Sequence, residues 1–219
     1  MAAKILTLEE RMDADEPLGV VNGRVVTATE DYDDEEGLSV QDAAPRTLYV
    51  RRDLLNAEEV VQFYADQLGQ NASVLSDPDK LHVTIAYSRK PVDWIKAGEA
   101  WDQDSRTGEL HLAPGGARLH ERLGKDGAKD ALVLQFTSSS LSSRWYCLHD
   151  VNEGSPYPSN DVGCSWDFPD YQPHVTVAWD KDQVVDEKLL QPWRGPLVFG
   201  PEIFEEVDED WKAKAGVDE

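Results

Sequence analysis

Two short segments of the chain place the same residue types at the same spacing. His82 and Thr84 lie in LHVTIAY, and His174 and Thr176 lie in PHVTVAW, which follows 92 residues later. An imidazole with a pKa of about 6.5 can accept a proton or, beside an anion, donate one. A threonine hydroxyl can donate a hydrogen bond to a phosphate oxygen. Two such pairs facing one phosphate would form an acid–base site that needs no metal.

The elements that must position these pairs are two β-strands, since residues 81–88 and 173–179 alternate apolar and polar side chains. A His and a Thr two positions apart point to the same side of a strand. The same alternation predicts Trp179 on the core side, and Ala86 and Ala178 on the side of the histidines. One His-x-Thr strand is ordinary, because Thr favours strands. Two matched copies favour a functional interpretation.

Further patterns predict a mixed α+β domain. Residues 47–55 alternate like a strand, and residues 56–69 have the apolar spacing of an amphipathic helix, with Asn56 and Glu59 as a capping box. Strands are also predicted near residues 109–114, 131–136 and 197–200. Residues 114–127 read as turns, and residues 138–151 fit either a helix or a strand.

The charge of the chain limits its partners. The formal net charge is −22, whereas proteins that bind long nucleic acids present basic surfaces to the phosphates. Long nucleic acid is therefore excluded as a partner, while a small anion in a local pocket is allowed. No apolar stretch is long enough for a membrane span, and the acidic N-terminus lacks the pattern of a signal peptide. We expect a soluble protein that is not exported and does not bind membranes.

The domain organisation follows from the composition. Residues 1–45 are acidic and have little apolar periodicity, so they are predicted to be a flexible extension. VV-NG-RVV within residues 19–29 predicts a small hairpin there. The globular domain is expected over residues 46–207, and residues 208–219 form an acidic tail.

A metal or cofactor site is not indicated. The remaining histidines, His111, His120 and His149, share no ligand spacing with each other or with the cysteines. Cys147 and Cys164 are too few for a disulfide framework and are predicted to be reduced thiols, which suits a cytoplasm. We expect no metal and no cofactor.

The two His-hydrophobic-Thr signatures resemble those of the two-histidine phosphoesterase superfamily, which includes RNA-ligase-like and cyclic-phosphodiesterase enzymes. The resemblance implies a bilobal α+β fold. Two antiparallel sheets, related by an approximate two-fold axis, would flank a central cleft lined by the motifs, with helices outside.

Longer strings resemble a narrower family, the anti-CBASS protein 1 family of phages. These strings are LYVRRDLLNAEE, LHVTIAYSRKPVDW, SWDFPDYQPHVTVAWD and GPLVFGPEIFEEV, and they span residues 47–207. The resemblance implies a phosphodiesterase that cleaves the cyclic di- and trinucleotide messengers of bacterial antiphage immunity, in the cytoplasm of the infected host. Its partner would be a small cyclic oligonucleotide such as cyclic GMP–AMP.

Four further residues are candidates for substrate binding. The resemblance implies that Tyr49 stacks on a base, and that Glu202 contacts a nucleobase edge. Arg89 directly follows the first motif strand, where it could meet a phosphate, and Trp166 precedes the second motif and could line a base pocket. In the implied mechanism one histidine deprotonates a ribose 2′-hydroxyl and the other protonates the departing 5′ oxygen. The sequence leaves open which histidine is the base.

The residues also allow other functions. An RNA cyclic phosphodiesterase or 2′–5′ ligase-like enzyme would use the same site, although the net charge argues against RNA. A protein that only sequesters cyclic nucleotides would need no acid–base pair. A structural phage component with an inactive two-histidine fold is a third possibility.

Overall fold

A computed structural model describes residues 44–99, 103–124, 130–149, 162–168 and 170–208, together with two strands nearer the N-terminus. The chain divides into two compact units, residues 1–42 and 43–219. In the first unit, β1 (Pro17–Val21) and β2 (Arg24–Thr27) pair antiparallel, which confirms the predicted hairpin. The other expectations for residues 1–43, and the acidic tail beyond residue 208, lie outside the described residues.

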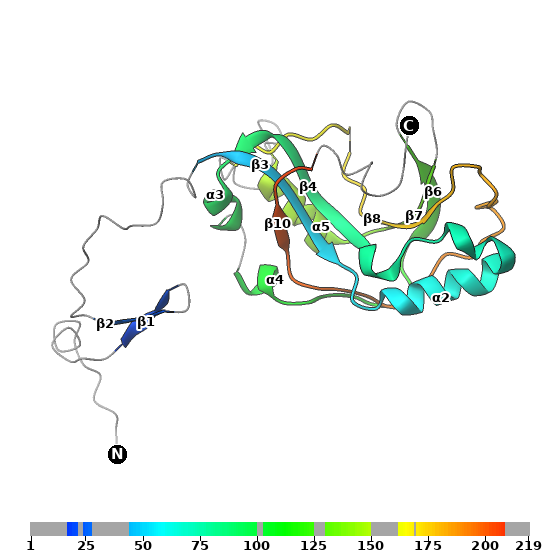
Figure 1. Ribbon diagram of the computed structural model, residues 1–219, viewed down its shortest axis with the longest axis horizontal. Helices are drawn as coiled ribbons and strands as arrows, with labels where there is room; N and C mark the ends of the chain where they lie inside the picture. Colours follow the sequence, from blue (N-terminus) through cyan, green and yellow to red (C-terminus); the bar gives the residue numbers. More distant parts are fainter. Residues whose placement is uncertain are drawn as a thin grey trace, which may run out of the picture. The chain divides into compact units, whose positions relative to one another are not determined.

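The second unit is built on a six-stranded sheet with the strand order β10-β3-β4-β8-β7-β6 (Figure 1). All of its pairs are antiparallel. The strands are β3 (Arg46–Asp53), β4 (His82–Val92), β6 (Arg118–Leu123), β7 (Ala131–Phe136), β8 (His174–Trp179) and β10 (Ile203–Glu205).

The sheet consists of two three-stranded halves that meet at one residue pair. β10, β3 and β4 form the first half, and β8, β7 and β6 form the second. Val83 of β4 and Val175 of β8 are the pair that joins them. Each half carries one His-x-Thr motif on its inner strand, so the predicted bilobal α+β fold is confirmed. The structure adds that the two halves are continuous through this pair.

Short helices and a second, two-stranded sheet complete the unit. Strands β5 (Leu110–Leu112) and β9 (Leu197–Phe199) pair antiparallel. The helices are α2 (Ala57–Leu68), η3 (Gly69–Val74), η4 (Pro78–Lys80), α3 (Trp94–Glu99), α4 (Gln103–Thr107) and α5 (Ser139–Leu148). Among the described residues, no helix is long and apolar enough to cross a membrane.

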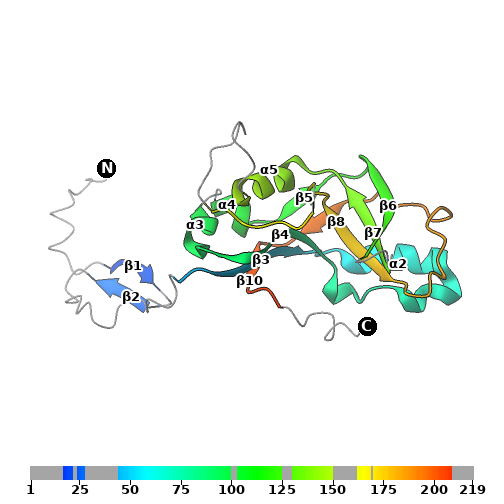
Figure 2. The same cartoon turned by 90° about the horizontal axis from the view of Figure 1, so that it is seen from above.

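The core lies on one face of the six-stranded sheet. Leu48, Val50, Val83 and Val175 are fully buried there, and α5 packs on this region of β4 (Figure 2). The ambiguous segment 138–151 forms this helix from residue 139 to 148, because the Ser138 hydroxyl accepts a hydrogen bond from the Leu141 amide at 3.3 Å and caps its first turn.

A β-bulge changes the predicted alternation in β4. The register passes from Val50–Ala86 to Arg51–Thr84, so Ile85 is an extra residue in β4. As a result Ile85 and Ala86 are both fully buried. The prediction that Ala86 shares the histidine face is therefore wrong.

The second motif strand has a bulge at the same position. The register passes from Leu132–Ala178 to Val133–Thr176, which makes Val177 the extra residue. Ala178 is consequently buried and Trp179 is 37% exposed. The prediction that Trp179 faces the core is wrong for the same reason.

Two other local predictions are corrected. Residues 114–127 were expected to be turns, but they contain β6, because residues 118–123 pair along their whole length with β7. The capping box is also absent, since the Asn56 side chain makes no cap to its own helix. Its Oδ1 instead accepts a hydrogen bond from the Val198 amide at 3.0 Å, which ties α2 to β9.

Candidate active site

The two motif histidines are held in the same way. The Nδ1–H of His82 donates to the Lys80 carbonyl at 2.7 Å, and that of His174 donates to the Gln172 carbonyl, also at 2.7 Å. In each case the acceptor is the carbonyl two residues earlier. Because a carbonyl can only accept, Nδ1 carries the proton of the neutral ring, and Nε2 is the basic atom.

The strand register brings the two motifs together. Antiparallel pairing of Val83 with Val175 sets His82 opposite Thr176, and Thr84 opposite His174. These four side chains are half-buried, whereas the valines between them are fully buried. Diagonal positions in such a pair lie about 7–8 Å apart, so the two imidazoles can flank one phosphate. The catalytic roles of the four residues stay predictions.

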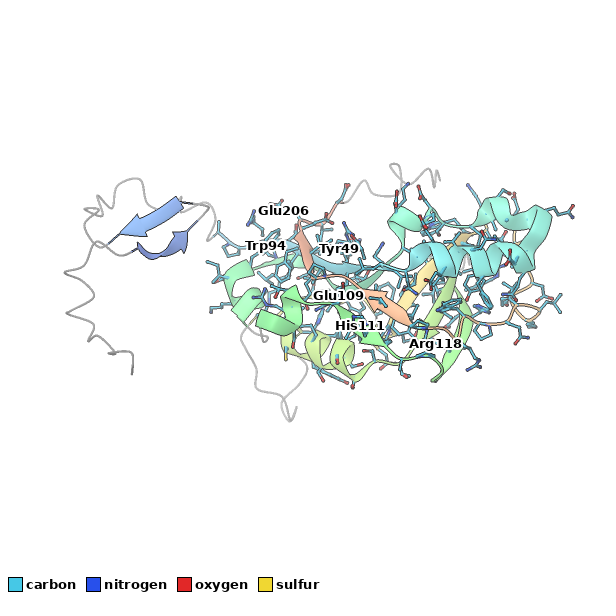
Figure 3. The ribbon with its side chains drawn as sticks, turned by 90° about the horizontal axis from the view of Figure 1, so that it is seen from below. Tyr49, Trp94, Glu109, His111, Arg118 and Glu206 are labelled. Carbon is cyan, nitrogen blue, oxygen red and sulfur yellow. The ribbon has the colours of Figure 1, made fainter. Side chains whose placement is uncertain are left out.

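Tyr49 of β3 contacts both residues of the first motif. Its hydroxyl lies 2.8 Å from His82 Nε2 and 3.0 Å from Thr84 Oγ1, and its ring meets the imidazole edge-on at 6.2 Å. Figure 3 labels Tyr49 on β3. Burial raises the pKa of Tyr49, which keeps the phenol protonated. Since His82 Nε2 is an acceptor in the neutral ring, the phenol donates to it and accepts from Thr84.

The second motif has different neighbours. Gln135 lies opposite His174 in the sheet, and its side-chain amide donates to the Gln172 side-chain oxygen at 2.7 Å. Glu121 of β6 pairs with Val133, the partner of Thr176. The sequence patterns did not single out Gln135, Gln172 or Glu121. Gln135 and Glu121 reach the motif only because β8 pairs with β7 and β7 pairs with β6. Gln172 lies two residues before His174 in the sequence.

The electrostatic surroundings of the two histidines differ. The pKa of each motif histidine is lowered, mainly because the ring is buried. At His82 the cation of Arg51 lowers the pKa further, while the Lys80 carbonyl and Glu205 raise it. At His174 the charged contributor is Glu121, whose carboxylate raises the pKa. A proton is therefore favoured on His174 by its charged neighbour more than on His82.

Arg89 and Trp166 lie near the first motif. The Arg89 guanidinium stands over the Tyr87 ring at 5.5 Å and pairs with Asp167 at 3.4 Å. Trp166 packs against Tyr171, with ring centroids 5.9 Å apart, and the Tyr171 hydroxyl donates to the Thr84 carbonyl at 3.0 Å. Substrate contacts by Arg89 and Trp166 stay predictions.

Glu202 lies in a buried ion cluster. Its carboxylate accepts hydrogen bonds from Arg144 Nε at 3.0 Å and Nη2 at 2.9 Å, and it lies 3.8 Å from Arg52 Nη2. The Glu202 side chain is 2% exposed. In this arrangement the carboxylate is fully engaged, so the structure gives no support to the predicted contact with a nucleobase edge.

The other histidines and the cysteines are separate from this site. His111 pairs with Glu109 at 2.7 Å on β5 (Figure 3), His120 meets the Tyr64 hydroxyl at 2.8 Å, and His149 stacks on Trp145. The two cysteines are free thiols. Within the described ranges, no group of three or more His, Cys, Asp or Glu side chains could hold a metal ion.

Comparison with known proteins identifies relatives. Residues 46–214 match the family model described as anti-CBASS protein Acb1. An anti-CBASS protein Acb1 of Sphingomonas paeninsulae is 48% identical over 178 residues, which are 81% of this chain and 26% of that protein. One of Acinetobacter phage Ac42 is 31% identical and aligns over 61% of this chain and 73% of that protein. The chain spans about a quarter of the length of the Sphingomonas relative.

Solved structures of Escherichia coli LigT are also similar. The complex with phosphate has a TM-score of 0.43 and 15% sequence identity, and the comparison covers 75% of this chain and 96% of LigT. The apo form has a TM-score of 0.44 and 16% identity, and it covers 75% and 95%.

Proposed function

Because the chain belongs to the Acb1 family of anti-CBASS proteins, we propose that it is a metal-independent phosphodiesterase. Its substrates are the cyclic di- and trinucleotide messengers of CBASS immunity, whose 3′–5′ bonds it cleaves in the cytoplasm of the infected bacterium. The observation that carries this proposal is the pair of His-Thr motifs, which lie on adjacent strands and face one side of the sheet.

We infer the roles of the two histidines from their surroundings. His82 is the base, since its Nε2 accepts a hydrogen bond from Tyr49 and Arg51 disfavours its protonation. His174 is the acid, since Glu121 favours its protonated form. An acid–base pair of this kind contributes a rate factor of about 10²–10⁴ for each group.

The proposed reaction has two steps. His82 takes the proton of the ribose 2′-hydroxyl, and the 2′ oxygen attacks the adjacent phosphorus. The bond from phosphorus to the 5′ oxygen breaks, and His174 gives its proton to that oxygen. Thr84 and Thr176 donate hydrogen bonds to the non-bridging oxygens, where negative charge builds. Water opens the resulting 2′,3′-cyclic phosphate with the roles of the histidines exchanged.

Cleavage assays test this function. The protein is incubated in EDTA with 3′3′-cyclic GMP–AMP, cyclic triadenylate and a short linear RNA, and products are separated by chromatography. We expect the cyclic substrates to be linearised faster than the RNA is cut. His111→Ala is the control variant, because His111 is exposed and pairs with Glu109 on β5. Intact cyclic substrates after long incubation would refute the proposal, and preferred cleavage of RNA would reassign the substrate.

A further inference from the structure

A row of three side chains crosses the second half of the sheet. His174 of β8 lies opposite Gln135 of β7, and Gln135 lies opposite Leu119 of β6, the strand at the edge of the sheet. Directly paired residues of antiparallel strands point to the same face, so all three side chains lie on the face of the motifs. Neighbouring strands are about 4.8 Å apart, so the row extends about 10 Å outward from His174.

The middle residue of this row is joined to a second amide. The Gln135 Nε2–H donates to the Gln172 Oε1 at 2.7 Å, and the backbone carbonyl of Gln172 is the acceptor that holds His174. Oε1 of Gln135 and Nε2 of Gln172 make no further hydrogen bond to a described residue. The pair therefore presents one acceptor and one donor beside His174. If both amides turn over together, their own bond is kept and the acceptor and the donor exchange places.

Leu119 adds an apolar surface at the outer end of the row. Its side chain is 49% exposed, while Gln172 is exposed and Gln135 is half-buried. A nucleobase has an apolar face and an edge that carries donors and acceptors side by side. The leucine and the amide pair offer one surface of each kind, and both lie next to the histidine that would protonate the departing 5′ oxygen.

We propose that Gln135 and Gln172 bind the edge of the nucleobase whose nucleoside departs with the 5′ oxygen, and that Leu119 contacts the face of that base. The inference rests on the proposed function and deepens it. His174 protonates the 5′ oxygen of this nucleoside, so its base lies on the His174 side of the phosphate. The row of about 10 Å has the length of one ribose with its base. Because the two amides can turn over together, they can bind either purine.

The test compares substrates with and without a base at this position. One is 3′3′-cyclic GMP–AMP, and the other is its analogue in which hydrogen replaces guanine. Stacking on an aromatic ring is typically worth more than an amide contact, so the remaining adenine takes the Tyr49 side and leaves the amide pair without a base. The kcat/KM of both substrates is measured in the wild type, in Gln135→Ala/Gln172→Ala and in Gln62→Ala. Gln62 is the control, because its exposed amide bonds to Asp66 on α2 at 2.7 Å.

With cyclic GMP–AMP the double variant should lose roughly 5- to 150-fold in kcat/KM, and with the analogue it should change by less than about twofold. Gln62→Ala should change neither value. The pH–rate profile should not move, because the carbonyl that holds His174 belongs to the backbone. If the double variant fails to fold, Gln172→Ala, at an exposed side chain, carries the test with a loss of roughly threefold to tenfold.

Two results overturn this inference alone. One is an unchanged kcat/KM for cyclic GMP–AMP in the double variant. The other is an equal loss with both substrates or a shifted pH–rate profile, which would mean that the amides only position His174. A wild type that cleaves neither substrate overturns the proposed function, and this inference with it.

Discussion

The Tyr49 hydroxyl lies against two atoms that the proposed mechanism assigns to contact with the substrate. It lies 2.8 Å from His82 Nε2 and 3.0 Å from Thr84 Oγ1, which are two of the atoms that would contact the substrate. Tyr49→Phe removes this hydroxyl and keeps the ring. Stability and phosphate affinity should then change in opposite directions.

The magnitudes follow from the two hydrogen bonds. Each contributes about 0.5–1.5 kcal/mol to folding, so the free energy of unfolding should fall by about 1–3 kcal/mol, and the melting temperature by several degrees. A bound phosphate must displace the same hydroxyl, so its removal should tighten phosphate binding by about fivefold to tenfold, or about 1–1.4 kcal/mol.

Urea unfolding measures the stability, and the inhibition constant of inorganic phosphate measures the affinity. Tyr87→Phe is the matched control. Tyr87 lies opposite Tyr49 in the sheet and packs on its ring, but the two hydrogen bonds come from the Tyr49 hydroxyl. Weaker phosphate binding in Tyr49→Phe would refute the reasoning, since it would mean that the hydroxyl assists the phosphate rather than competing with it.

Three further predictions concern pH, buried charge and metal removal. Burial lowers the pKa of His149 in the folded protein to about 4. As the pH falls from about 7 towards 4, His149 is protonated in the unfolded chain before it is protonated in the folded protein, so stability is lost over this range. Urea unfolding should show a loss of about 2 kcal/mol at pH 5 relative to pH 8 from this residue, and an equal acid loss in His149→Phe would contradict it. Glu202→Gln leaves Arg144 buried without its charge partner and should lower the unfolding free energy by about 3–5 kcal/mol; the control Glu206→Gln, at an exposed ion pair with Arg46, should cost less than about 1 kcal/mol. Dialysis against EDTA should leave turnover unchanged, and activity that returns only on adding a divalent ion would contradict the metal-free mechanism.

The sequence could predict what depends on local period. The two-residue alternation placed His82 and Thr84 on one face, and the structure has them there, because period two is a property of the strand itself. It could not predict the bulges at Ile85 and Val177. A bulge is defined by the residues of the partner strand, so it leaves no mark on the alternation and reverses the side of every residue that follows, including Trp179.

The sequence also could not predict contacts between distant segments. Tyr49 was assigned a role beside the substrate by resemblance, but its hydrogen bonds to His82 depend on the pairing of β3 with β4. Glu202 stands in an acidic stretch that looks solvated in the sequence. Arg144, 58 residues away, pairs with it and draws it into the interior, and nothing in the local pattern indicates that partner.

The central claim is that His82 acts as the base and His174 as the acid on one phosphate. It is tested most directly with a cyclic dinucleotide whose scissile 5′ oxygen is replaced by sulfur, because a thiolate leaves without protonation. With the ordinary substrate, His82→Ala and His174→Ala should each lose about 10²–10⁴ in rate. With the sulfur substrate, His174→Ala should recover nearly the wild-type rate, while His82→Ala stays slow. Recovery in His82→Ala alone would reverse the two roles, and recovery in neither variant would contradict acid–base catalysis by this pair.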